Sequence, residues 1–123
     1  MERKQILVVD DDILIQEMLI ICLDDFEIVT ANNGKKGMAL VHPNSQFDCI
    51  LTDYQMPEMN GIEFLKHCKI TVPNIPIIMM SGVNDIKKIA ISNGACAFIN
   101  KPFYPEILLN ELDHLFSLEI NKR

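Results

Sequence analysis

Residues 6–12 read ILVVDDD, four apolar residues followed directly by three aspartates. The unbroken, branched run from Ile6 to Val9 is typical of a short strand that is buried on both faces, as in a parallel sheet. Residues 47–53 (FDCILTD) and 76–82 (PIIMMSG) have the same form, an apolar run that ends at polar or small residues. These stretches predict the central strands of one sheet.

Shorter strands and helices are predicted around this centre. Residues 27–30 and 97–100 are expected to form two further strands. Helices are expected at residues 13–24, 35–41, 62–70, 84–93 and from Pro105 to about Ile120. Strict alternation of strand and helix predicts an α/β fold, a doubly wound five-stranded parallel sheet with helices on both faces.

Local signals support these helix boundaries. Leu14, Met18 and Ile21 stand at helical spacing in the first helix, which Asp12 is placed to cap. Gly94 stands where a C-terminal cap belongs, and Pro105 at a first turn that tolerates proline.

Composition limits the classes of function. The chain has 123 residues, of which 49% are hydrophobic, so residues 1–123 are expected to form one domain with a real core. A formal net charge of −6, without a basic run, argues against direct binding to nucleic acid or to an anionic membrane. The apolar run at residues 6–9 is too short for a signal peptide, and we expect a cytoplasmic protein.

The cysteines and histidines do not form a recognisable metal motif. Cys22, Cys49, Cys68 and Cys96 are far apart in the sequence, so we expect reduced thiols in or near the core rather than a zinc site. None of the histidines follows a predicted strand, and we expect surface positions for His42, His67 and His114. Met79 and Met80 are expected in the core. Met56 and Met59 are expected in the loop after Asp53, packed over that residue.

Polar side chains stand at the carboxyl ends of four predicted strands, where open parallel sheets bind ligands. They are Asp10 and Asp11, Asp53, Ser81 and Lys101. Converging carboxylates repel one another, and a hard divalent cation such as Mg²⁺ relieves this repulsion with oxygen ligands. An aspartate can attack phosphorus to give an acyl phosphate, with a lysine and a hydroxyl contacting the phosphoryl oxygens.

Four stretches together resemble the response-regulator receiver family, of the chemotaxis-regulator type, over essentially the whole chain. They are ILVVDDD (6–12), DCILTDYQMPEMNGIEFL (48–65), IPIIMMSG (75–82) and FINKPF (98–103). The resemblance implies a flavodoxin-like sheet of strand order 2-1-3-4-5. It also implies a phosphoacceptor switch, not an enzyme with a separate substrate, that promotes its own phosphorylation and dephosphorylation.

The resemblance also implies roles for particular residues. Asp53 corresponds to the phosphorylated aspartate, Lys101 to the family's lysine, and Ser81 and Phe98 to the switch residues. The implied metal, Mg²⁺ or Mn²⁺, is held by Asp11 and Asp53, by Asp10 through water, and by the backbone carbonyl of Gln55. The Lys101–Pro102 bond is expected to be cis.

The implied partners are a histidine kinase or phosphotransfer protein and a downstream effector protein or domain, with a phosphorylation-linked homodimer as a further possibility. The last helix carries eight apolar residues, and one helix face cannot bury all of them: Ile107, Leu108, Leu109, Leu112, Leu115, Phe116, Leu118 and Ile120. Some are expected to remain exposed on an output surface made by the fourth helix, the fifth strand and the fifth helix.

Three other functions are less compatible with the same residues. An aspartate-based phosphatase would need a second acid two residues after its nucleophile, where this chain has Gln55. A flavin or nucleotide binder would need a phosphate-binding loop after the first strand, where residues 10–14 read DDDIL. A receiver that had lost its chemistry would lack an acid or the lysine, and all of these are present.

Overall fold

The computed structural model describes the backbone of residues 3–121 and the side chains of that range except Asn84 and residues 118–121. Its strands are β1 (Gln5–Val9), β2 (Glu27–Ala31), β3 (Cys49–Asp53), β4 (Ile77–Ser81) and β5 (Ala97–Asn100). Its α-helices are α1 (Ile13–Cys22), α2 (Gly34–Leu40), α3 (Gly61–Thr71), α4 (Lys87–Ser92) and α5 (Pro105–Asn121). The predicted alternation of strands and helices is therefore confirmed.

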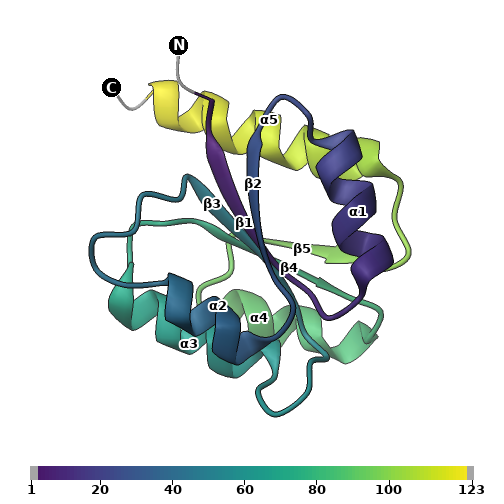
Figure 1. Cartoon of the computed structure of the whole chain (residues 1–123), viewed down its shortest axis with the longest axis vertical. Coiled ribbons are helices and arrows are strands. Elements are labelled where there is room, and N and C mark those ends of the chain that lie inside the picture. Colours follow the sequence, from purple (N-terminus) through teal and green to yellow (C-terminus); the bar gives the residue numbers. More distant parts are fainter. Residues whose placement is uncertain (1–2, 122–123) are drawn as a thin grey trace.

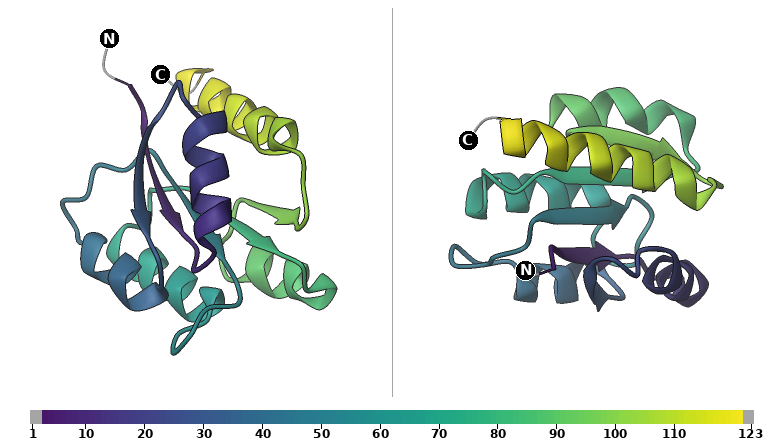
Figure 2. Two further views of the ribbon diagram at one scale, coloured as in Figure 1. Left: turned by 45° about the vertical axis from the view of Figure 1, so that its right-hand side comes forward. Right: turned by 90° about the horizontal axis from the view of Figure 1, so that it is seen from above.

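The strands form one parallel sheet in the order β2-β1-β3-β4-β5, as expected. Helices α1 and α5 cover one face of this sheet, and α2, α3 and α4 cover the other (Figures 1 and 2). Such an arrangement leaves β2 and β5 as the edges and buries β1, β3 and β4 from both sides.

The alternation of side chains along β1 divides the core into two layers. Ile6 and Val8 pack with α1 and α5, whereas Leu7 and Val9 pack with the helices of the opposite face. All four side chains are fully buried. A strand that faces two apolar layers has no polar position, which explains the continuous apolar runs in the sequence.

Most of the predicted helix signals have the expected geometry. The Asp12 carboxylate caps α1 by accepting a hydrogen bond of 2.9 Å from the Leu14 N–H. Gly94 lies just after α4 with a φ of +107°, and Pro105 is the first residue of α5. The single helix predicted at residues 84–93 is instead a 3₁₀ turn, η1 (Asn84–Ile86), followed by the short α4.

The residues at helical spacing in α1 are not the ones that the helix buries. Leu14 and Ile21 are 72% and 73% exposed, and Met18 is half-buried. The residue of α1 that is fully buried is Leu19, one position along from Met18. The helix is apolar nearly all round, so helical spacing fits several of its faces and does not select the one that packs.

Helix α5 leaves some of its apolar residues exposed, as predicted. Leu108, Leu112 and Phe116 are buried, whereas Ile107 is 50% exposed. Leu109 and Leu115 are half-buried, and the side chains of Leu118 and Ile120 lie outside the described set.

The reactive side chains also have defined places. Cys49 and Cys68 are buried and Cys22 is half-buried, but Cys96 is exposed, contrary to the prediction. Burial raises the pKa of the Cys68 thiol to about 12, which makes it unreactive. Met79 and Met80 are fully buried, as predicted.

The histidines lie near the surface. His42 and His114 are exposed and His67 is half-buried, as expected for helix-face or loop residues. Among the described residues, no helix has the length and apolar character needed to cross a membrane.

We predict that alanine substitutions at two leucines of α1 will distinguish its buried face from its exposed face. Leu19→Ala should lower the free energy of unfolding by about 2–5 kcal/mol, because it leaves a cavity beneath the helix. Leu14→Ala, its control, should change it by less than about 0.5 kcal/mol. Urea unfolding of both variants measures the difference, and equal losses would show that the packed face is misassigned.

Candidate functional site

The carboxyl ends of four adjacent strands bring the predicted polar side chains together. Asp53 is the last residue of β3 and Ser81 the last of β4, while Asp10 and Lys101 directly follow β1 and β5. The strands pair in register, so these four positions lie along one edge of the sheet. The site is therefore assembled from segments that are far apart in sequence.

Three carboxylates form an acidic cluster at this edge. One oxygen from each of Asp10, Asp11 and Asp53 lies within 4.8 Å of the others. Asp10 is fully buried and Asp53 is 7% exposed, whereas Asp11 is open to solvent. Three oxygen donors, one of them accessible from outside, are a donor set suited to a hard divalent cation.

The Lys101 ammonium lies between two of these carboxylates. Its Nζ is 2.7 Å from Asp10 Oδ2 and 3.3 Å from Asp53 Oδ1. Burial lowers the pKa of this ammonium, but the hydrogen bond to Asp10 and the negative charges of both acids outweigh it, so the pKa is raised. Lys101 is thus held in its charged form.

Asp53 has a less favourable electrostatic environment than Lys101. Burial raises the pKa of the Asp53 carboxyl, and the Asp10 carboxylate raises it further. Lys101 and the Tyr54 N–H act in the opposite direction without cancelling these effects. Burial opposes the charged form of both groups, but Lys101 has two anions beside it, whereas Asp53 has an anion as well as a cation beside it.

Backbone groups fix the orientation of both buried carboxylates. Asp10 Oδ1 accepts a hydrogen bond of 2.9 Å from the Asp12 N–H, and Asp53 Oδ1 accepts one of 2.9 Å from the Tyr54 N–H. The Ser81 hydroxyl accepts from the Val83 N–H at 3.0 Å, and the Lys101–Pro102 bond is cis, as expected.

The loop after Asp53 turns back tightly onto the strand. The Gly61 N–H donates to the Tyr54 carbonyl at 2.7 Å, and a Cβ at Gly61 would lie 2.3 Å from the Asp53 carbonyl oxygen. Only glycine permits this approach. Met56 and Met59 are half-buried and pack against the core layer that contains Phe64 and Leu65, and a Cβ at Gly34 would lie 3.1 Å from Met59. Gln55 is exposed within this loop, and the metal role of its carbonyl stays a prediction.

Sequence reasoning missed one residue that supports the site. The Gln16 side-chain amide donates to the Asp10 carbonyl at 2.7 Å and to the Ala31 carbonyl at 3.2 Å, so α1 is tied to the ends of β1 and β2. Gln16 is a polar residue inside the apolar segment ILIQEMLIIC, and that contrast was the available signal.

Phe98 is half-buried on β5. It pairs in register with Met79 and packs against the core on the side of α2, α3 and α4. The ring therefore lies one strand away from β4, which ends at Ser81.

Comparison with known protein families matches residues 6–113 to the response regulator receiver domain. The Arabidopsis thaliana two-component response regulator ARR2 is 30% identical over 96% of this chain and 18% of its own length. The Pseudomonas aeruginosa phosphate regulon transcriptional regulatory protein PhoB is 37% identical over 91% of this chain and 51% of its own length. The chain thus spans about half, or less, of these relatives.

Solved structures with the same fold include chemotaxis proteins. The Vibrio cholerae chemotaxis response regulator CheY4 has a TM-score of 0.85 and 32% identity, covering 93% of this chain and 99% of its own. A CheY-like receiver domain protein from Methanospirillum hungatei has a TM-score of 0.88 and 29% identity, covering 98% and 99%.

We predict that Asp53→Asn will stabilise the metal-free protein at neutral pH. The folded pKa of Asp53 lies above its ordinary value of 3.8, so the ionised carboxylate opposes folding at pH 7. This cost shrinks as the pH falls through the raised pKa and is absent below the ordinary value. Urea unfolding with a chelator should therefore show a gain that disappears on acidification. Asp113→Asn, an exposed control on α5, should show no such gain, and a less stable Asp53→Asn at pH 7 would contradict this electrostatic account.

Proposed function

This chain belongs to the response regulator receiver domain family, and from that premise we propose that Asp53 accepts a phosphoryl group in a divalent-metal-dependent reaction. The donor is a histidine kinase or a phosphotransfer protein of a two-component system. The observation that carries the proposal is the nearly buried Asp53 carboxylate, set between the Asp10–Asp11 pair and the Lys101 ammonium.

The metal proposed here is Mg²⁺ or Mn²⁺. Asp10, Asp11, Asp53 and the Gln55 backbone carbonyl would hold it, with Asp10 acting through water. When bound, the ion neutralises charge on the carboxylates and on phosphoryl oxygens. The fit rests on the three oxygens within 4.8 Å of one another, and on the preference of these ions for oxygen donors.

Asp53 and Lys101 have separate roles in the proposed phosphoryl transfer. An Asp53 carboxylate oxygen forms the new bond to phosphorus while the bond from phosphorus to the donor's imidazole nitrogen breaks, and its electron pair stays on that nitrogen. Lys101 then transfers part of its hydrogen bonding from the carboxylates to the phosphoryl oxygens. Its charge is already present within 3.3 Å of Asp53, so no charged group must be recruited.

Phosphorylation is proposed to act on the surface of α4, β5 and α5 through Ser81 and Phe98. The Ser81 hydroxyl, which now accepts from the Val83 N–H, turns to donate to a phosphoryl oxygen. The Phe98 ring then moves into the vacated space. Exposed apolar residues around this surface suit an effector or a second receiver: Ile89, Ile91, Tyr104 and Ile107.

The setting proposed for this switch follows from its composition. Residues 1–123 act as one receiver domain in the cytoplasm. Their net charge of −6 disfavours direct contact with nucleic acid, so the signal passes to a partner protein or an attached domain.

We predict that incubation with acetyl phosphate or phosphoramidate will label the protein at Asp53 alone, and only with Mg²⁺ or Mn²⁺. Mass spectrometry should find one added phosphoryl group in the wild type and none in Asp53→Asn or after chelation. Asp12→Asn is a matched control, because Asp12 is exposed and only caps α1. Labelling of Asp53→Asn, or labelling that survives chelation, would rule out the proposal.

We predict that Lys101→Ala will accept phosphate but fail to switch. The wild type with beryllofluoride should show changed amide hydrogen exchange on α4 and β5. Lys101→Ala should show less than about a tenth of that change, because no ammonium at position 101 remains to contact the phosphoryl oxygens or their mimic. Lys66→Ala, an exposed lysine on α3, serves as control. A Lys101→Ala variant that switches normally would show that the role is misassigned.

A further inference from the structure

The outer edge of β2 carries backbone groups that point away from the sheet. Glu27 N donates to the Lys4 carbonyl, and the Ala31 carbonyl accepts from Asp10 N, so residues 27 and 31 face β1. In a parallel ladder, alternate residues face the same neighbour. The N–H and C=O groups of Ile28 and Thr30 therefore point outward, at an edge where residues 3–121 place no neighbouring strand.

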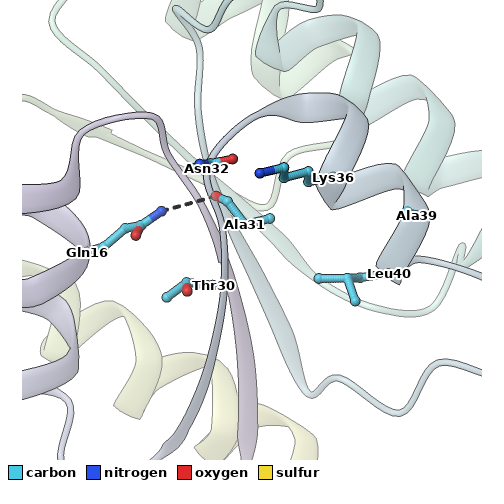
Figure 3. Close-up of a pocket in the computed structure, with 7 residues that line it drawn as sticks. All are labelled: Gln16, Thr30, Ala31, Asn32, Lys36, Ala39 and Leu40. Atoms are coloured by element: carbon cyan, nitrogen blue, oxygen red, sulfur yellow. Dashed lines mark hydrogen bonds between the residues drawn. The ribbon is translucent and has the colours of Figure 1, made fainter.

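The carboxyl end of this edge lines a groove between α1 and α2. A cavity of about 440 Å³ follows the end of β2. Gln16 of α1 lines one side, and Lys36, Ala39 and Leu40 of α2 line the other, with Thr30 and its neighbours between them (Figure 3). Such a groove admits a single extended chain, whereas a second folded copy would bring its own helices against these walls.

The groove has an apolar wall on the side of α2 and a polar wall on the side of α1. Leu40, which is 36% exposed, and Ala39 line the side of α2, whereas Gln16 lines the side of α1. Lys36 lines the groove next to the carboxyl end of β2, and the exposed Glu27 lies beyond the groove at the amino end of the strand.

We propose that the edge of β2 binds an extended segment of a partner protein, which adds to the sheet as a sixth strand. The segment has alternating apolar side chains that pack on Leu40 and polar side chains that face Gln16, and it forms hydrogen bonds with the outward backbone groups of Ile28 and Thr30. Charge complementarity requires an acidic residue at the Lys36 end and a basic residue at the Glu27 end.

This binding site is separate from the phosphoryl site but linked to it. Gln16 lines the groove and donates to the Asp10 carbonyl at 2.7 Å. The proposal does not rest on phosphorylation, because the open strand edge and the groove are present in the unmodified protein.

The test uses two synthetic peptides, Lys-Val-Thr-Val-Thr-Val-Glu and its reverse, each with blocked ends, because the direction of the added strand decides which one matches the charges. NMR titration of ¹⁵N-labelled protein should show one of them shifting the amides of Ile28, Thr30 and Lys36. N-methylation of the peptide amides on one edge should abolish binding, and methylation on the other edge should not.

Two protein variants form a matched pair. Thr30→Pro removes the outward N–H, at an edge position where proline is tolerated, whereas Thr30→Ala retains it. We expect Thr30→Pro to weaken binding about tenfold and Thr30→Ala to weaken it less than about threefold. Lys36→Glu should remove the preference between the two peptides, because both ends of the site are then acidic.

Three results would overturn the proposal. The first is that neither peptide shifts the amides of β2, and the second is that Thr30→Pro binds as well as Thr30→Ala. The third is self-association in sedimentation that Thr30→Pro abolishes, which would assign the edge to a second copy of the chain.

Discussion

The contact of the Lys101 ammonium with Asp10 and Asp53 is the constraint on which the site depends. Asp10 is fully buried, and a buried carboxylate without a cation would be costly. Lys101 relieves that cost for Asp10 at 2.7 Å, but at 3.3 Å it leaves Asp53 with a raised pKa. The ionised form of Asp53 is therefore unfavourable in the resting site, and added positive charge would stabilise it.

The parallel sheet brings these charged groups together. Four strands deliver polar groups to one edge because parallel strands all end at the same side. Continuous apolar runs hold these ends in register, and glycine at position 61 allows the following loop to pass directly over Asp53. The polar cluster thus has rigid support on its inner side and solvent beyond Asp11.

The sequence predicts this arrangement well where residue type and structure are tightly coupled. An apolar run that ends in aspartate identifies both a buried strand and its functional end, so the strands and the positions of Asp10, Asp53, Ser81 and Lys101 were predictable. The packed face of α1 was not, because apolar residues surround that helix and only the tertiary structure selects Leu19. Gln16 was missed for a related reason: its partners are backbone carbonyls, which leave no trace in the sequence.

The ion pair between Lys101 and Asp10 joins residues that are 91 positions apart. During synthesis on the ribosome, both buried aspartates are made long before their cation. Strand β5 must join the sheet before Lys101 can reach them, and contacts of such long range form late in folding. Until then the aspartates must remain hydrated, which keeps the carboxyl edge of the nascent sheet open. Closure of this edge therefore cannot precede the joining of β5, and a chain shortened before residue 101 would retain the acids without the charge that balances them.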